Sequence, residues 1–346
     1  MWRLRRDGCG FLIWLALAAP ASAACGLTKV AQMPLIQLGA HFAVSVKIDG
    51  RDRPMIVDTG APFTLLGARA AEELGLPIDP DPAHMHPVFG LGQTSADLHP
   101  NVIPGTIAFG DLVFRDRSTV VATLDSGAAP ESDSIGLLGD DILSRYDVEF
   151  DFPGRTLTFY HASGCYETFV PWDGAYAAIP FEHRRSSVVI DVIFDHERTR
   201  TLLDTGNNVS FVSWRAPALW DVAASDLSAT TIRSSSPLNG GTSHPVALYT
   251  FQRVAIGDDE TRDKTMNVVD VDHPFASANL GLDYLGRRKF WLSYPNGQMF
   301  IADRESTTTL AYPVDGEPQA MVRAPSGAAP LQAPADARTA IAFHTR

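Results

Sequence analysis

Two stretches of the chain follow one pattern: PMIVDTGAPFTLL, residues 54–66, and RTLLDTGNNVSFV, residues 200–212. Each has an apolar run, then Asp-Thr-Gly, then a second apolar run. A single copy of this tripeptide means little, because Asp, Thr and Gly are also common in turns. Two copies in the same context predict two similar lobes that present Asp58 and Asp204 to each other. A pair of facing carboxylates can share one proton and activate a water molecule.

The repeat extends beyond these two stretches. Residues 42–58 align without a gap with residues 188–204, at a constant offset of 146. Two later blocks also repeat in the same order: residues 107–125 with 254–272, and residues 136–160 with 278–302. The first block alternates apolar and polar residues around a turn, which predicts a hairpin whose second strand leads into the acid. The many short strands with regular turns favour an all-β fold.

Composition divides the chain into five segments. The start is basic, an apolar run covers residues 11–19, and Ala21-Ser22-Ala23 has the small residues of a signal cleavage site. Few large apolar residues occur near the end, so the tail cannot bury enough surface to offset its ordering entropy. The predicted segments are a signal peptide (1–23), an N-terminal lobe (24–165), an inter-lobe linker (166–185), a C-terminal lobe (186–303) and a disordered tail (304–346).

Three cysteines are present, and Cys9 would leave with the signal peptide. In an oxidising compartment the remaining Cys25 and Cys165 could form a disulfide. Two alternatives stay open: both thiols are free, or Cys25 carries a lipid anchor, since Ala23-Ala24-Cys25 resembles the end of a lipoprotein signal. The formal net charge of −12 argues against a nucleic acid as partner.

The order of these elements resembles that of the retropepsin-like aspartic proteases. Asp58-Thr59-Gly60-Ala61 is the form found in retroviral enzymes, and GLLGDDIL at residues 136–143 is similar to the start of their conserved helix. Asp140 stands where Arg is common. Two copies in one chain resemble the pepsin arrangement. The resemblance covers residues 40–303 and implies an all-β, bilobal aspartic protease fold: two β-barrel-like lobes with the active-site cleft between them.

By this resemblance Asp58 and Asp204 are the catalytic dyad. Like charges a few ångströms apart cannot both ionise at low cost, so the pair titrates as a unit. One carboxylate would act as general base on the shared water, and the other, protonated, would polarise the scissile carbonyl. Thr59 and Thr205 would form hydrogen bonds across the lobe interface and hold the two loops.

The next residues in each motif would support the site. Gly60 and Gly206 would let backbone N–H groups approach the carboxylates. Ala61 follows in the first motif, whereas the second has Asn207 where Ala, Ser or Thr is usual. The side chain of Asn207 could donate a hydrogen bond to Asp204, or it could point away.

A mobile hairpin over the cleft is the usual lid of such a site, and glycine suits it. Two glycine-containing segments are candidates, and an ordinary glycine turn is the alternative for each. The candidate flap glycines are Gly90 and Gly92 in the first lobe, and Gly240 and Gly241 in the second.

Two functions follow as hypotheses. The first is an exported aspartic endopeptidase, in the bacterial periplasm or secreted, that needs no metal or cofactor. It would bind a polypeptide substrate in extended form, and the internal duplication favours a monomer. The second is a non-catalytic peptide-binding module on the same fold, because a fold does not guarantee its chemistry.

Overall fold

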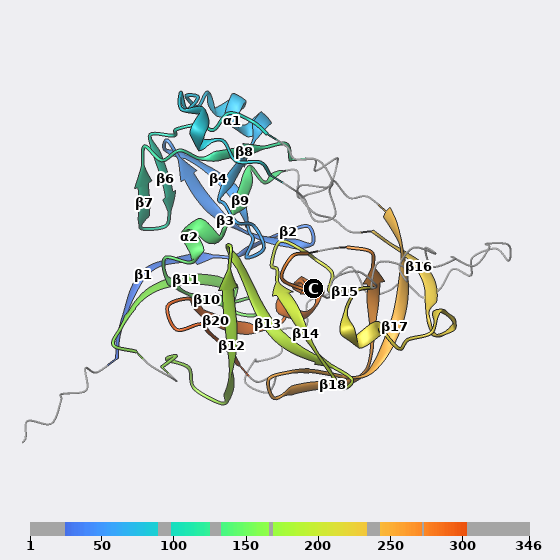
Figure 1. Ribbon diagram of the computed structural model, residues 1–346. Coiled ribbons are helices and arrows are strands. Elements are labelled where there is room, and N and C mark those ends of the chain that lie inside the picture. Colours follow the sequence, from blue (N-terminus) through green and yellow to red (C-terminus); the bar gives the residue numbers. More distant parts are fainter. Residues whose placement is uncertain are drawn as a thin grey trace, which may run out of the picture.

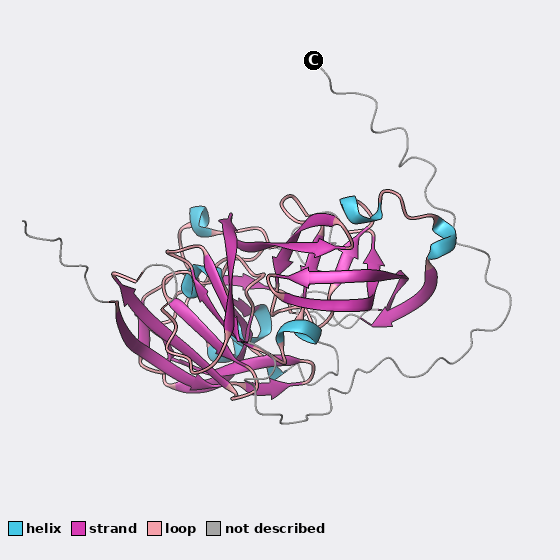
Figure 2. Cartoon of the chain, turned by 90° about the horizontal axis from the view of Figure 1, so that it is seen from below, coloured by secondary structure: helices cyan, strands magenta, loops and turns pink. Residues whose placement is uncertain are grey.

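The computed structural model describes residues 25–88, 98–124, 133–165, 169–233, 243–271 and 273–302. The predicted signal peptide, the predicted tail and the candidate flap glycines (Gly90, Gly92, Gly240 and Gly241) lie outside the described residues. Within the described part, strands predominate and the helices are short (Figure 2). This confirms the predicted all-β class.

The first half of the chain contains strands β1 (Gly26–Pro34), β2 (Ile36–Leu38), β3 (His41–Ile48), β4 (Arg51–Val57), β5 (Leu65–Gly67), β6 (Thr106–Phe109), β7 (Leu112–Arg115), β8 (Val120–Ala122), β9 (Gly136–Leu138), β10 (Asp147–Asp151) and β11 (Thr156–Ser163). The second half contains β12 (Tyr176–Arg184), β13 (Ser187–Phe194), β14 (Glu197–Leu203), β15 (Phe211–Ser213), β16 (Ser228–Arg233), β17 (Ser243–Ile256), β18 (Asp259–Val269), β19 (Ala278–Leu280), β20 (Lys289–Ser293) and β21 (Gln298–Ala302). The helices are α1 (Ala68–Leu74), α2 (Asp140–Leu143) and α3 (Leu282–Leu285), with 3-10 turns η1 (Pro82–His84), η3 (Pro217–Leu219) and η4 (Ala224–Asp226).

These strands form two barrel-like sheets, as the bilobal prediction required (Figure 1). The 8-stranded sheet has the order β7-β6-β3-β4-β9-β5-β8, with β2 paired to β3. The 13-stranded sheet has the order β1-β11-β10-β20-β21-β12-β13-β14-β19-β15-β18-β17-β16. The predicted bilobal, all-β architecture is therefore present.

The two lobes do not separate at the boundaries expected from the sequence. Strands β1, β10 and β11 come from the predicted N-terminal lobe, but they join the sheet of the second half through the antiparallel pair β10–β20. The predicted linker at 166–185 contains strand β12, which pairs with β21 and β13. Proline and glycine around this strand suggested a loop; its alternating apolar residues nevertheless bury Ile179 and Phe181 against the sheet.

The sequence repeat appears as a repeat of strand pairing. Strand β4 pairs in parallel with β9 and ends beside Leu138, and β14 pairs in parallel with β19 and ends beside Leu280. The hairpin β3–β4 has Ile48 opposite Arg51, and the hairpin β13–β14 has Phe194 opposite Glu197. Each Asp-Thr-Gly loop thus leaves the same position in its own lobe.

Aromatic packing joins the two halves in the shared sheet. Phe150 of β10 lies directly opposite Phe290 of β20, and their rings stack with centroids 4.6 Å apart. Both side chains are fully buried. Burial of a side chain of this size stabilises by about 1.5–3 kcal/mol, so this pair is a substantial part of what holds the halves together.

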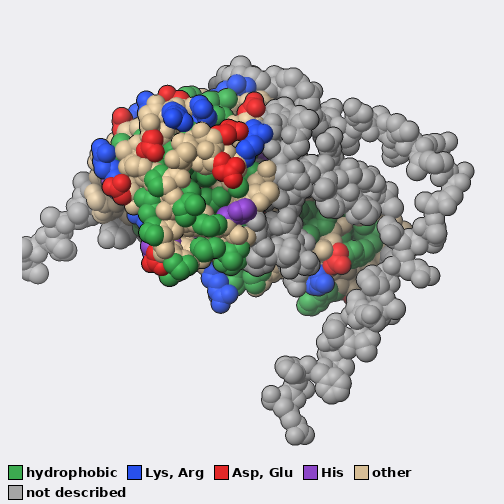
Figure 3. All heavy atoms as spheres, turned by 90° about the horizontal axis from the view of Figure 1, so that it is seen from above, with side chains coloured by type: hydrophobic (Ala, Val, Ile, Leu, Met, Phe, Trp, Pro, Cys, Tyr) green, Lys and Arg blue, Asp and Glu red, His purple; other side chains and the backbone are tan. Residues whose placement is uncertain are grey.

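The surface carries charges of both signs. On the face in Figure 3, acidic and basic side chains are interspersed around a group of hydrophobic ones. Such mixing is typical of a solvated protein surface.

A disulfide joins Cys25 to Cys165 across 140 residues of chain. It lies at the end of the β1–β11 pair, where Gly26 is opposite Ser163. The bond therefore fastens the start of the described chain to the sheet that both halves share.

We expect the double substitution Cys25→Ser/Cys165→Ser to lower the free energy of unfolding by roughly 4–5 kcal/mol, because it releases a long closed loop in the unfolded chain. Denaturant titration of the mature protein measures this change. A reducing agent should destabilise the native protein to the same extent and leave the double variant unaffected. A decrease in the free energy of unfolding of less than about 1 kcal/mol would show that the β1–β11 pairing stabilises this end of the sheet without the disulfide.

Candidate active site

The two Asp-Thr-Gly loops are positioned by matching backbone hydrogen bonds. The N–H of Asp58 donates to the carbonyl of Leu138 at 3.0 Å, and the N–H of Asp204 donates to the carbonyl of Leu280 at 3.0 Å. Each acid therefore sits immediately beyond the last parallel pairing of its strand with β9 or β19. The strand ends fix where both loops begin.

Thr59 and Thr205 connect the loops through four hydrogen bonds. The Thr59 hydroxyl donates to the Leu203 carbonyl at 2.8 Å and accepts the Thr205 N–H at 3.1 Å. The Thr205 hydroxyl donates to the Val57 carbonyl at 2.8 Å and accepts the Thr59 N–H at 3.1 Å. Both threonines are fully buried or nearly so. The structure thus contains the cross-lobe contacts that the resemblance implied.

Glycine is required where the loops approach each other. A Cβ atom on Gly206 would lie 2.2 Å from the carboxyl carbon of Asp58, and one on Gly60 would lie 2.7 Å from that of Asp204. No side chain fits at such distances. The third residue of each motif therefore packs against the acid of the other motif.

The structure brings Asp58 and Asp204 together where the two loops meet, so that the charge of Asp204 acts on Asp58. Their exposed fractions are 7 % and 8 %. Asp58 Oδ1 accepts the N–H groups of Gly60 at 2.9 Å and Ala61 at 3.0 Å. Asp204 Oδ1 accepts the N–H of Gly206 at 3.0 Å. Because like charges this close together cannot both ionise at low cost, the two acids titrate as a coupled pair.

Burial raises the pKa of Asp58 well above its ordinary value of 3.8, and the negative charge of Asp204 raises it further. Burial also raises the pKa of Asp204, although hydrogen bonds oppose that rise, first from Asn279 and then from the Gly206 N–H. A carboxyl group that stays protonated beside one that ionises is the arrangement that acid–base catalysis by a dyad needs.

The side-chain donor to Asp204 is Asn279 and not Asn207. Asn279 Nδ2 lies 2.9 Å from Asp204 Oδ2, whereas Asn207 Oδ1 accepts the N–H of Val209 at 3.1 Å within its own loop. Asp204 therefore accepts its side-chain hydrogen bond from Asn279, and the side chain of Asn207 bonds within its own loop. Asn279 lies in β19, and nothing in the sequence placed this segment against the dyad except its alignment with the block that contains β9.

His41 is a second contact that sequence reasoning missed. It is fully buried at the start of β3, and its Nε2 lies 3.1 Å from the carbonyl oxygen of Gly206. A carbonyl only accepts, so Nε2 carries the hydrogen and donates it. This hydrogen bond connects the first lobe to the Asp-Thr-Gly loop of the second lobe.

Asp140, the residue that departs from the usual helix start, also connects the halves. His183 Nε2 in β12 lies 2.9 and 3.0 Å from its two carboxyl oxygens. Burial raises the pKa of Asp140, while His183 opposes the rise. Its backbone N–H donates to the Ala61 carbonyl at 2.9 Å, so this residue also supports the first Asp-Thr-Gly loop.

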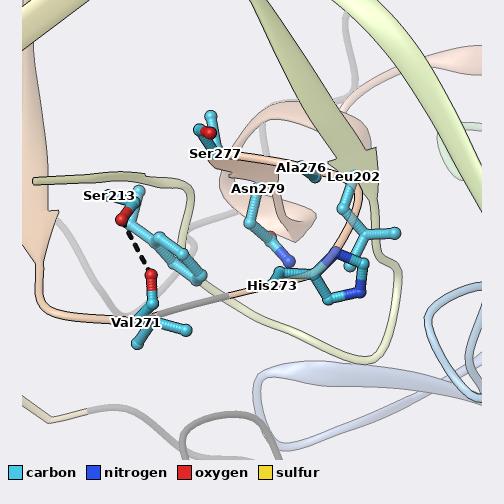
Figure 4. Close-up of a pocket in the computed structure, with 9 residues that line it drawn as sticks. Leu202, Ser213, Val271, His273, Ala276, Ser277 and Asn279 are labelled. Atoms are coloured by element: carbon cyan, nitrogen blue, oxygen red, sulfur yellow. Dashed lines mark hydrogen bonds between the residues drawn. The ribbon is translucent and has the colours of Figure 1, made fainter. Parts of the chain in front are cut away.

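A small pocket lies in the second lobe (Figure 4). It includes Leu202, which lies two residues before Asp204, and Asn279, which contacts Asp204 directly. The remaining lining residues are Phe211, Ser213, Val271, His273, Ala276, Ser277 and Ala278. The pocket therefore has a mixed apolar and polar lining, and Asn279 connects it to the second acid.

No group of three or more His, Cys, Asp or Glu in the described ranges is arranged to hold a metal ion. None of the helices in the described part of the chain is long and apolar enough to cross a membrane.

Comparison with known proteins found a family match and similar solved structures. Residues 44–142, which include the first Asp-Thr-Gly motif and the start of α2, match the family model described as "Aspartyl protease". Among solved structures, the chain is similar to an aspartic proteinase from Irpex lacteus, at 14 % sequence identity and a TM-score of 0.48, over 82 % of this chain and 99 % of that one. A search of curated proteins found no match. The family match shows that this part of the first lobe is similar to aspartyl proteases.

The raised pKa of Asp58 has a consequence for stability. Above pH 3.8 the unfolded chain releases a proton that the native protein keeps on Asp58. The native state then binds more protons than the unfolded state, so this group's contribution to the free energy of unfolding decreases as the pH rises through that window.

We expect the free energy of unfolding of Asp58→Asn to increase relative to that of the unsubstituted protein as the pH rises from about 4. The increase should be up to about 1.4 kcal/mol per pH unit. Denaturant titrations of both proteins over pH 3–8 measure the difference, and subtraction removes the shared effect of other carboxylates. A difference that does not change with pH would contradict a retained proton.

Proposed function

We propose that the protein is an exported aspartic endopeptidase that hydrolyses peptide bonds with a water molecule activated between Asp58 and Asp204. The observation that carries this proposal is that these two acids, presented by opposite loops, lie buried together where the loops meet. The match of residues 44–142 to the aspartyl protease family supports aspartic protease activity in general.

The reaction follows from one proton shared by two carboxyl groups. The water oxygen attacks the carbonyl carbon while its proton passes to the ionised carboxylate and the other carboxyl gives its proton to the carbonyl oxygen. The resulting diol collapses as the C–N bond breaks. The amine takes the proton that came from water, and a diol hydroxyl returns a proton to the second carboxylate. A free acid and a free amine leave, and the dyad is restored.

The substrate in this proposal is a polypeptide in extended form. An extended strand places alternate side chains on opposite sides, so that one can enter a pocket while the backbone crosses the dyad. The internal duplication supplies both acids from one chain, which supports a monomer as the active form.

Export is the second part of the proposal. The basic start, apolar run and small-residue site of residues 1–23 support it, and a disulfide persists in an oxidising compartment. Because Cys25 is bonded to Cys165, its sulfur is not available for a lipid. We therefore propose a periplasmic or secreted protein without a lipid anchor.

We expect the full-length chain, expressed in a bacterium with an export pathway, to appear outside the cytoplasm with residues 1–23 removed. N-terminal sequencing and intact mass of the exported protein measure this. A chain that keeps its first residues, or one whose mass includes a diacylglycerol group on Cys25, would contradict the corresponding part of the proposal.

For catalysis, we expect purified mature protein to cleave an unfolded protein substrate, and a peptide analogue with a hydroxyl at the scissile position to inhibit it. Asp58→Asn and Asp204→Asn should each lower kcat/KM by at least about 10²–10⁴, the usual contribution of one acid–base group. Mass spectrometry of the products locates the cleaved bonds.

A matched control is Asp116→Asn, because Asp116 is exposed in a turn at φ 47°, a conformation that Asn tolerates. This variant should retain activity. Cleavage that survives both dyad substitutions would rule out the proposal. Tight peptide binding without cleavage, unaffected by Asp58→Asn, would favour the non-catalytic binding module instead.

A further inference from the structure

The two lobes differ at one position beside the dyad. Leu137 in β9 pairs with Ile56, two residues before Asp58, and Asn279 in β19 pairs with Leu202, two residues before Asp204. The two residues therefore occupy equivalent positions in the repeated fold. One lobe has a hydrocarbon side chain there, and the other has an amide.

This difference gives the two acids different hydrogen-bond partners. Asn279 Nδ2 lies 2.9 Å from Asp204 Oδ2, and Asn279 is only 2 % exposed. Leu137 is fully buried and has no donor to offer Asp58. The hydrogen bonds that reach Asp58 from its own loop are those of the Gly60 and Ala61 backbone.

We propose that Asn279 is a positioning residue that holds Asp204 as the ionised member of the dyad and leaves the shared proton on Asp58. An amide N–H group donates well to a carboxylate oxygen, and donation to a charged acceptor is about twice as strong as donation to a neutral one. The N–H of Asn279 thus favours the charged form of Asp204. The hydrogen bond between the two acids then runs from the Asp58 hydroxyl to Asp204.

The charges around Asp204 act in the same direction. The titratable groups that face it are Asp58 across the loops and His41 at the start of β3. The interaction with His41 favours the ionised form of Asp204. Burial and the charge of Asp204 favour the protonated form of Asp58.

The consequence for catalysis rests on the proposed function: Asp204 becomes the general base that takes the proton of the water, and Asp58 becomes the acid that polarises the carbonyl. The order of ionisation itself does not require that the protein cleave anything. The inference can therefore be tested by titration and by kinetics separately.

The titration uses mature protein labelled with ¹³C at the Asp side-chain carboxyl carbons. In the native protein, the first of the two coupled ionisations of the dyad should appear mainly at Asp204, with resonances assigned by comparison with Asp58→Asn and Asp204→Asn. In Asn279→Leu, which copies the equivalent residue of the first lobe, the lower pKa of the dyad should rise by about one unit, the size expected for a lost hydrogen bond to a charged group.

The kinetic arm measures kcat/KM against pH, whose acidic limb reports the lower pKa of the free enzyme. In Asn279→Leu this limb should shift upward by the same amount, while a merely structural substitution would lower the rate without moving the limb. Asn279→Ala, which cannot clash in a tight site, should shift it in the same direction. Circular dichroism and thermal unfolding show whether each variant is folded.

Asn207→Ala is the matched control, because Asn207 is nearer to Asp204 in sequence but its side chain bonds Val209. The acidic limb of its kcat/KM profile should stay at the same pH, whatever the absolute value of kcat/KM.

An unchanged lower pKa in both Asn279 variants would overturn the inference and leave the proposed function intact. A downward shift would also overturn it, because it would mean that Asp204 is protonated and donates to the amide oxygen. If native protein cleaves nothing, the proposed function fails and the ¹³C titration still decides the order of ionisation.

Discussion

The hydrogen bonds between Thr59 and Thr205 determine where the rest of the site lies. Each hydroxyl accepts the N–H of the other threonine and donates to the carbonyl before the other acid, at 2.8–3.1 Å. Both residues are buried, so a separation of the loops would leave polar groups without partners, at about 1–3 kcal/mol each. This connection keeps the two carboxyl groups close together although burial and like charge both oppose it. The stacked rings of Phe150 and Phe290 hold the halves together farther from the dyad.

Duplication supplies a symmetric frame, and a few side chains make it asymmetric. The backbone bonds of Asp58 and Asp204 to the ends of β9 and β19 are the same length, and the threonine contacts are reciprocal. Asn279 donates a hydrogen bond to Asp204, where the first lobe has Leu137 at the equivalent position, and His41 bonds the carbonyl of Gly206 in the second loop. A symmetric pair of acids has no preference for which member is charged. A general base and a general acid must differ, so these single-sided contacts are where chemistry can be assigned within a repeated fold.

The sequence was informative where neighbours along the chain decide the structure. Alternating apolar residues around a turn predicted the hairpins β3–β4 and β13–β14, and both form. The pairing of Cys25 with Cys165 was one of three alternatives, and the structure contains that bond. The sequence did not predict strand β12, because proline and glycine residues occur in and beside it. Its partner strand β21 also lies more than a hundred residues later in the chain.

The sequence by itself determined that two Asp-Thr-Gly loops end two similar hairpins in an all-β protein, because apolar periodicity and turn residues act over short distances. Only the tertiary structure decided which polar groups surround the acids. Asn279 reaches Asp204 across 75 residues, and His41 reaches Gly206 across 165. Such contacts depend on how lobes and strands pack together, and no local pattern of residues records that. Asn207 illustrates the limit: it lies close to the acid along the chain, yet its side chain completes a turn in its own loop.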